Sequence, residues 1–244
     1  MLCSVCGEAL GIHSFGGAST EASETVCRPC KATPPAFTQA VAHGLYQSEL
    51  RSLLHLLKYD GIEPVADKLG ILLARQILAL QDASQEMAVI PVPLFKGKRR
   101  QRGFNQAAVL AHAAVKAMRR LQPERKLTVA TDLLERGRAT ESQAGLTPHQ
   151  RRANMRGAFF VPAPEKLKGA DVLLIDDIYT TGATARACAQ ALIRAEAHSV
   201  RVVTVARAQR QEMVQPPAKP AAELPMHEDV AFWDSGFVPA ARGV

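Results

Sequence analysis

An acidic pair and a cluster of threonines follow one apolar segment of the chain. The run VLLIDDIYTTGAT (172–184) reads as a buried strand, then Asp176 and Asp177, then a turn rich in hydroxyl groups. Where a strand turns into a helix, the backbone N–H groups of the first helical turn and the helix dipole form a site for a phosphate group. Two adjacent carboxylates beside that site would repel each other and the phosphate. A ribose with two free hydroxyls, together with Mg²⁺ bridging a pyrophosphate, removes both conflicts.

The same turn differs from the other common nucleotide sites. The chain contains neither the GxxxxGK[ST] pattern of a P-loop nor the GxGxxG pattern of a dinucleotide site. Gly182 has no Cβ, so the backbone can approach a ligand closely at that position. We therefore expect a phosphoribosyl ligand to contact the following residues: Asp176, Asp177, Thr180, Thr181, Gly182, Ala183 and Thr184.

A strongly basic turn follows an earlier strand, in the run IPVPLFKGKRRQRGFNQ (90–106). We expect the strand at 87–92 to lie beside the strand at 172–176 in a parallel sheet, so that both turns open on one crevice. Arginine suits this position because its guanidinium can bind two phosphate oxygens at once. The candidate contacts with phosphate oxygens in this turn are Pro93, Leu94, Phe95, Lys96, Arg99 and Arg102.

Positive charge is concentrated in one part of the chain. Residues 96–156 contain fifteen Lys and Arg against four acids, although the whole chain carries a net charge of only +7. Such a local field suits an anionic ligand, which is either a pyrophosphate or a nucleic-acid backbone. An aromatic content of 5% argues against a platform of many rings for base stacking. The candidates for contact with single-stranded DNA are Lys98, Arg99, Arg100, Arg151 and Arg152.

Four of the five cysteines form two Cys-x2-Cys pairs in the first thirty residues: Cys3, Cys6, Cys27 and Cys30. Each pair gives a tight turn with two thiolates on one side, and this spacing is typical of a structural zinc ribbon. Thirty residues are too few to fold without a metal or a covalent link. Disulfides are the alternative, which a reducing compartment disfavours. Cys188 lies in an Ala-rich helical segment and is expected in the core.

Strands and helices alternate along the rest of the chain, which predicts an α/β domain with a mainly parallel sheet and flanking helices. We expect strands at 40–46, 87–93, 127–135, 158–161, 172–176 and 199–206, and helices at 48–59, 64–81, 105–121 and 184–196.

Three parts of the chain differ in composition. Residues 1–36 form the zinc unit and a linker (KATPPA, 31–36), residues 37–210 form the α/β domain, and residues 211–244 form a Pro-rich, disordered tail. The N-terminus shows no signal-peptide pattern, and the most apolar stretch is too short to cross a bilayer. We expect a cytoplasmic protein without a membrane span.

The run at 172–184 resembles the phosphoribosyl pyrophosphate (PRPP) motif of type I phosphoribosyltransferases. In that family the acidic pair binds the ribose hydroxyls and the threonine-rich loop binds the 5′-phosphate. A turn after an earlier strand binds the pyrophosphate, and the resemblance assigns that role to the Pro93 turn. The chain is also similar to the ComF family of competence proteins. That resemblance rests on PVPL followed by RxRGFNQ (90–106), on RxRATxSQxGLTxxxRRxNMRGAF (136–159) and on LLKYDG (56–61).

The resemblance implies a loop at 136–156 that closes over PRPP and excludes water. With the acidic pair, Arg136 and Arg138 of this loop become candidate catalytic residues. Two functions follow. The first is PRPP binding by a ComF-type protein in DNA uptake, with single-stranded DNA and DNA-uptake or recombination proteins as partners. The second is an active phosphoribosyltransferase that releases pyrophosphate from Mg·PRPP onto an unidentified acceptor.

Overall fold

The structure is a computed structural model, and its described part covers residues 1–10, 25–59, 63–80, 82–137, 150, 155 and 157–208. The expected tail at 211–244 and the candidate residues Arg138, Arg151 and Arg152 lie outside the described residues. Among the helices of the described ranges, none combines the length and the apolar character that crossing a membrane requires.

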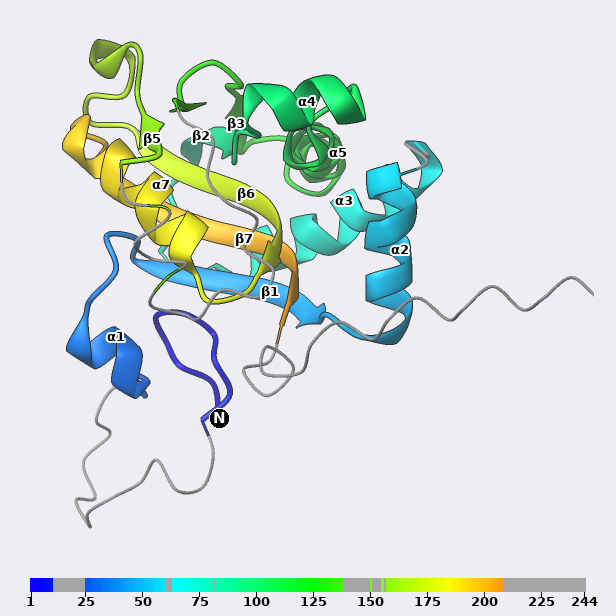
Figure 1. Cartoon of the computed structure of the whole chain (residues 1–244), viewed down its shortest axis with the longest axis horizontal. Coiled ribbons are helices and arrows are strands. Elements are labelled where there is room, and N and C mark those ends of the chain that lie inside the picture. The colour runs from blue at the N-terminus through cyan, green and yellow to red at the C-terminus, as the bar shows by residue number, and fades with distance from the viewer. Residues whose placement is uncertain are drawn as a thin grey trace, which may run out of the picture. The chain divides into compact units, whose positions relative to one another are not determined.

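A five-stranded sheet, in which every pairing is parallel, forms the centre of the domain (Figure 1). From one edge to the other its strands are β1 (Gln39–Leu45), β7 (Ser199–Arg207), β6 (Asp171–Tyr179), β2 (Glu86–Pro91) and β3 (Lys126–Val129). The side chains of Val172, Leu173, Leu174 and Ile175 in β6 are completely buried. A strand covered on both faces needs such a continuous apolar run, which explains the pattern found in the sequence.

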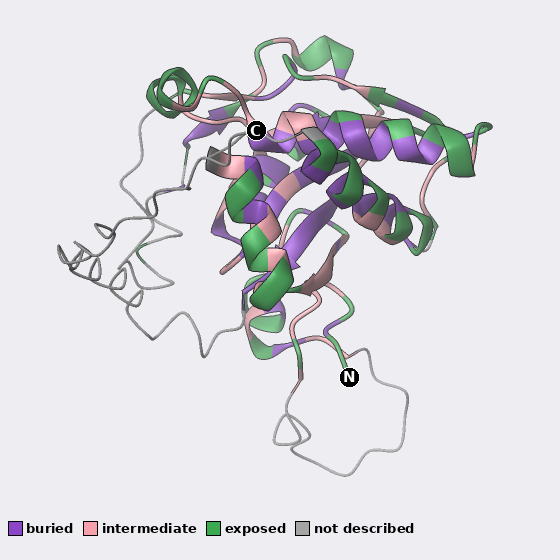
Figure 2. Ribbon diagram, turned by 90° about the vertical axis from the view of Figure 1, so that its right-hand side faces the viewer, coloured by how far each residue is buried: buried purple, intermediate pink, exposed green. Residues whose placement is uncertain are grey.

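Helices cover both faces of the sheet. On one face, α2 (Ser48–Tyr59), α3 (Glu63–Leu78) and α5 (Gln106–Leu121) share a core with Leu173 and Ile175. On the other face, α7 (Ala183–Arg194) shares a core with Val172 and Leu174. The two connections β2–α5–β3 and β6–α7–β7 run toward opposite edges of the sheet, so right-handed crossovers place their helices on opposite faces. Figure 2 shows the buried residues on the sheet and on the helix surfaces that face it.

Two predicted strands turned out differently. The segment at 127–135 is not one strand, because the chain leaves the sheet after Val129 and buries Leu133 and Leu134 before a short strand β4 (Glu135–Arg136). The predicted strand at 158–161 shortens to β5 (Phe159–Phe160). It pairs with β4 in an antiparallel two-stranded sheet and does not join the central sheet.

Helices occupy parts of two segments that were predicted to be a turn and a linker. The basic residues after the Pro93 turn form α4 (Lys96–Arg102), since Lys, Arg and Gln favour helix when no packing opposes it. Gly103 ends α4 with φ +82°, and its N–H donates to the carbonyl of Arg99. The first two residues of the expected 31–36 linker belong to α1 (Arg28–Ala32). One 3-10 helix, Pro164–Lys166, lies between β5 and β6.

Candidate functional site

Strands β2 and β6 lie side by side, as predicted, and the chain leaves their carboxyl ends in opposite directions. Ligands of open α/β sheets bind at such a switch point. Pairing between the two strands ends near Pro91 and Ile175, where the Val92 N–H still donates to the Ile175 carbonyl (2.9 Å). Beyond that point β6 continues to Tyr179 along β7 only. The Pro93 turn and residues 176–184 therefore flank the point at which the two strands part, which we call the opening.

The two acids of this opening point to opposite faces of the sheet, because successive side chains of a strand alternate. Asp176 has the same orientation as Val172 and Leu174 on the α7 face, and Asp177 faces the other helices. On that side Lys58, near the end of α2, places its Nζ 2.7 Å from Oδ2 of Asp177. The cation that the sequence required for the acidic pair is thus partly supplied by the chain itself.

The pKa values of the two carboxyl groups shift in opposite directions. Burial raises the pKa of Asp176 well above its usual range, and the charge of Asp177 raises it further. Burial would also raise the pKa of Asp177, but the Lys58 ammonium outweighs burial and lowers it. The pKa of Lys58 is raised by the same ion pair, against the effect of its own burial. The pair therefore combines one firmly ionised carboxylate with one that retains its proton more readily.

The phosphate loop, which we define as residues 180–184, follows β6 and leads into the N-terminus of α7. Gly182 is the N-cap residue with φ +74°, and its carbonyl accepts from the N–H of Arg186 (2.9 Å). A Cβ at Gly182 would lie 2.5 Å from Cζ of Tyr179 and still closer to the hydroxyl oxygen. The structure thus gives two reasons for glycine here, the left-handed backbone and the Tyr179 ring, besides the close approach of a ligand expected from the sequence.

The Pro93 turn is held by a residue that the sequence analysis did not single out. Asn105 donates from Nδ2 to the Val92 carbonyl (3.0 Å), and its Oδ1 accepts from the Ala107 N–H (3.1 Å) at the start of α5. Arg102 donates to Oε1 of the buried Gln106 (2.6 Å), which orients its guanidinium. The cations of α4 before it are exposed: Lys96, Lys98, Arg99 and Arg100.

Arg136 stands at the start of the expected closing loop, most of which lies outside the described residues. Its guanidinium lies 5.6 Å from the ring centre of Phe159, its partner in the β4–β5 pair. Burial raises the pKa of Cys188, the Asp176 charge raises it further, and the Arg136 charge lowers it. Phe159 belongs to the core that α7 shares with Val172 and Leu174, so the β4–β5 pair lies on the face of the sheet to which Asp176 points. Cys188 itself is a core residue, as predicted.

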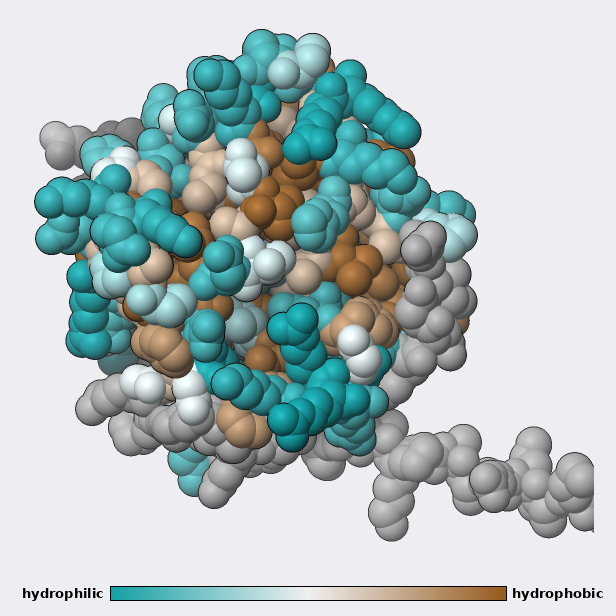
Figure 3. All heavy atoms as spheres, turned by 90° about the horizontal axis from the view of Figure 1, so that it is seen from above, coloured by the Kyte–Doolittle hydropathy of each residue, from teal (hydrophilic) through white to brown (hydrophobic). Residues whose placement is uncertain are grey.

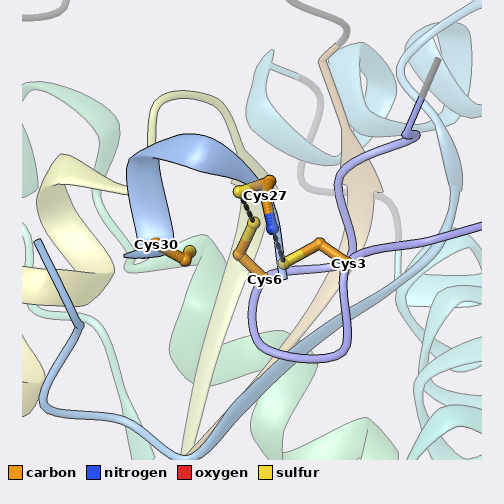
Figure 4. Close-up of side chains that lie close together, drawn as sticks. All are labelled: Cys3, Cys6, Cys27 and Cys30. Atoms are coloured by element: carbon orange, nitrogen blue, oxygen red, sulfur yellow. Dashed lines mark hydrogen bonds between the residues drawn. The ribbon is translucent and has the colours of Figure 1, made fainter. Parts of the chain in front are cut away.

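The four N-terminal cysteines converge at one point (Figure 4). Their Sγ atoms all lie within 4.8 Å of one another, with 3.6 Å between those of Cys6 and Cys27. Zn–S bonds of about 2.3 Å in a tetrahedron require sulfur atoms about 3.8 Å apart, so the cluster fits such an ion. The N–H of Cys27 donates to the Cys3 sulfur (3.2 Å), an arrangement that favours a thiolate ligand. All four cysteines are free, and the cluster can therefore hold a metal ion.

The sequence analysis also gave no role to Lys58, Tyr179, Arg186 or Arg207, which contact the acidic pair, the phosphate loop or the cysteines. Lys58 and Tyr179 left a signal, because they lie in the quoted segments LLKYDG and VLLIDDIYTTGAT, whereas Arg186 and Arg207 lie outside every motif. Figure 3 views the molecule from the side of α4 and shows hydrophilic side chains gathered around a more hydrophobic centre.

Comparison with known proteins gives consistent matches. A family model described as "Phosphoribosyl transferase domain" matches residues 105–237, which include the acidic pair and the phosphate loop. The DNA utilization protein YhgH of Escherichia coli O157:H7 is 29% identical over 213 residues, covering 84% of this chain and 90% of the relative. Competence protein F of Haemophilus influenzae is 27% identical, covering 75% and 78%. Competence protein ComFC of Bacillus subtilis is 22% identical, covering 84% and 78%.

Proposed function

Because the chain belongs to the phosphoribosyl transferase domain family, we propose that it binds PRPP with Mg²⁺ at the switch point between β2 and β6. The observation that carries the proposal is the adjacency of these two strands. It brings an acidic pair, the N-terminus of α7 and a basic turn to the same edge of a type I phosphoribosyltransferase fold. Each of the three features matches one part of the ligand, namely the ribose hydroxyls, the 5′-phosphate and the pyrophosphate.

The acidic pair is proposed to receive the ribose. Lys58 keeps Asp177 ionised, so its carboxylate can accept a hydrogen bond from a hydroxyl group. Asp176 points to the α7 face of the sheet, the face against which the β4–β5 pair with Arg136 also lies. Mg²⁺ prefers oxygen ligands and would be held by Asp176 and the pyrophosphate, whose negative charge it would reduce.

The two phosphate groups are proposed to bind on either side of the ribose. The first turn of α7 offers N–H groups that have no carbonyl partner within the helix, and the hydroxyls of Thr180, Thr181 and Thr184 add donors for the 5′-phosphate. On the other side, the turn at 93–96 and the oriented Arg102 offer positive charge to the pyrophosphate.

DNA uptake is the proposed cellular role, in the cytoplasm, with a structural zinc ion in the cysteine cluster. Two relatives are named competence proteins and one a DNA utilization protein. The exposed cations of α4 support contact with single-stranded DNA, because they lie beside the opening and are not buried by other parts of the described chain. DNA-uptake or recombination proteins are the expected protein partners.

Transfer of the phosphoribosyl group is the second candidate function. In that reaction the bond between C1′ and the pyrophosphate oxygen breaks, pyrophosphate leaves with the electron pair, and an acceptor atom bonds to C1′ and loses a proton. The observation that favours it is the raised pKa of Asp176, because a carboxyl group with a raised pKa can accept that proton. Arg136 would stabilise the departing charge from the same face.

Calorimetric titration of the full chain with PRPP, with and without Mg²⁺, tests the proposal. We expect one binding event per chain that depends on Mg²⁺ and is lost when Asp176→Asn and Asp177→Asn are combined. Absence of binding to the wild-type chain would refute the PRPP site. Labelled PRPP incubated with a panel of bases and nucleotides then separates the two functions. Pyrophosphate release that depends on one acceptor identifies an enzyme, and binding without release identifies a PRPP-binding protein.

A further inference from the structure

Arg207, the last residue of β7, connects the cysteine cluster to β6. Its guanidinium is buried and donates from Nη1 to the carbonyl of Cys6 (2.5 Å). Nη2 pairs with the Glu8 carboxylate and lies 3.9 Å from the Cys6 sulfur. The other contact of this guanidinium is the ring of Tyr179, whose centre lies 4.5 Å from Cζ. One side chain therefore touches a cysteine-bearing turn and the last residue of β6.

Tyr179 carries this contact on to the phosphate loop. It is the register partner of Arg207 in the parallel pair β6–β7, so both side chains stand on the same face of the sheet. Its hydroxyl end packs against Gly182, where no Cβ can be accommodated. Phe37 packs edge-on against the same ring, with centroids 6.5 Å apart. The ring is thus held on one side by Arg207 and Phe37, and it limits the position of Gly182 on the other.

A second connection starts within α7. Arg186 donates from Nη1 to the carbonyl of Thr33 (2.6 Å) and from Nη2 to the Cys30 sulfur (3.5 Å). The backbone N–H of Arg186 donates to the carbonyl of Gly182 (2.9 Å). Arg186 therefore joins the second cysteine pair to the first turn of α7, as Arg207 joins the first cysteine pair to β6.

The two arginines also suit the charge of a metal centre. Four thiolates around a divalent cation carry two excess negative charges, and each arginine directs one guanidinium at one ligand sulfur. Donors to ligand atoms fix the orientation of the ligands and affect metal affinity. Loss of the metal would leave the two cysteine pairs without a common centre, and both arginines would lose their fixed partners.

We propose that the four-cysteine metal site positions the phosphate loop through Arg207–Tyr179 and through Arg186, so that metal occupancy sets the affinity for a phosphoribosyl ligand. The ligand half of this inference, that metal occupancy sets the affinity for a phosphoribosyl ligand, rests on the proposed function. The positioning half, that the metal site positions the phosphate loop, does not. Arg186, Arg207 and Tyr179 are positioning residues, because they act on the loop and not on the ligand.

Hydrogen–deuterium exchange tests the positioning half without any ligand. The full chain is compared with zinc bound and after chelation, using peptides that cover 178–186 and, as a control on the other face of the sheet, 106–121 of α5. We expect faster exchange at 178–186 after chelation and unchanged exchange at 106–121. Unchanged exchange at 178–186, together with faster exchange around the cysteines, would overturn the proposal.

Matched variants test the ligand half and remain informative if chelation unfolds the whole chain. Arg207→Lys keeps the positive charge but cannot contact Cys6, Glu8 and Tyr179 at the same time. Arg201→Lys is the matched control, because it makes the same replacement in the same strand, where Arg201 contacts Ser199 and Asp82. With one zinc ion per chain in both, we expect Arg207→Lys to weaken Mg·PRPP binding about tenfold and Arg201→Lys to leave it unchanged. Equal affinities in the two variants would overturn the coupling. A wild-type chain that does not bind PRPP would refute the proposed function, and the exchange experiment would still decide the coupling.

Discussion

The ammonium of Lys58 and the carboxylate of Asp177 form an ion pair across the face of the sheet, with 2.7 Å between Nζ and Oδ2. Their side chains are only 18% and 9% exposed, so water solvates neither charge well and each charge is stabilised by the other. The pair links α2 to the acidic residues of β6 and separates the behaviour of Asp177 from that of Asp176.

Replacing Lys58 by Met should destabilise the fold, because it leaves the buried Asp177 without its partner. We expect the free energy of unfolding to fall by about 3 kcal/mol. Lys116→Met is the matched control, since Lys116 pairs with Asp67 and both side chains are more than half exposed. Its effect should stay below about 1 kcal/mol. Urea unfolding at pH 7 measures both, and equal effects would contradict the importance of the buried pair.

Replacing Asp176 by Asn should make stability less dependent on pH. The raised pKa means that the folded chain holds this proton more tightly than the unfolded chain. The stabilising contribution of Asp176 is therefore complete below its unfolded pKa of about 3.9 and is lost as the pH rises through the folded pKa. Relative to the wild type, Asp176→Asn should gain stability between acidic and neutral pH, measured by urea unfolding at several pH values.

Asp177→Asn should change the pH dependence of stability in the opposite direction. Its pKa is lowered in the folded chain, so its contribution is present above the unfolded pKa and is lost as the pH falls through the folded pKa. The variant should be less stable than the wild type at neutral pH and approach it in acid. If the stability of both Asn variants, relative to the wild type, changed with pH in the same direction, the pKa values of the two carboxyl groups would not be shifted in opposite directions.

Replacing Gly182 by Ala should disrupt the phosphate loop. Gly169→Ala separates the two causes, because Gly169 has a similar φ of +72° and a Cβ there would meet nothing within 4 Å. We expect Gly169→Ala to cost about 1 kcal/mol from the left-handed backbone. Gly182→Ala should cost about 2 kcal/mol more, because its Cβ overlaps Tyr179. Thermal unfolding measures the difference, and calorimetry should show that only Gly182→Ala loses PRPP binding.

Neutralising α4 should weaken the proposed binding of single-stranded DNA. Arg99→Gln with Arg100→Gln removes two exposed cations, and Arg119→Gln with Arg120→Gln removes two exposed cations from the end of α5. Each lost phosphate contact reduces the magnitude of the negative slope of log K against log salt by about 0.7. The slope of the α4 variant should therefore be smaller in magnitude by about 1.4. Fluorescence anisotropy at several salt concentrations measures the slopes. An unchanged slope in the α4 variant would remove this helix from the DNA surface.

Much of the site could be predicted from the sequence because its parts are local. The run at 172–184 contains the strand, the acidic pair and the helix start in order, and the parallel pairing with 87–92 follows from the alternation of strands and helices. The Cys-x2-Cys spacing likewise predicted a cluster that the structure contains. The predictions at 127–135 and at 158–161 were only partly right, because the first strand ends at Val129 and the second pairs with β4 in a separate two-stranded sheet. Apolar character predicts that a segment is at least partly buried but does not show which partner covers it.

The sequence by itself determined the type of fold, the residues at the ends of the two site strands and the grouping of four cysteines that can hold a metal ion, because each depends on neighbours along the chain. Only the tertiary structure showed that Lys58 pairs with Asp177 and that Arg207 joins Cys6 to Tyr179. These contacts join residues that are far apart in the chain and depend on how helices and strands pack, which no local spacing encodes. The same packing splits the acidic pair between two faces of the sheet, and so shifts the pKa values of two identical side chains in opposite directions.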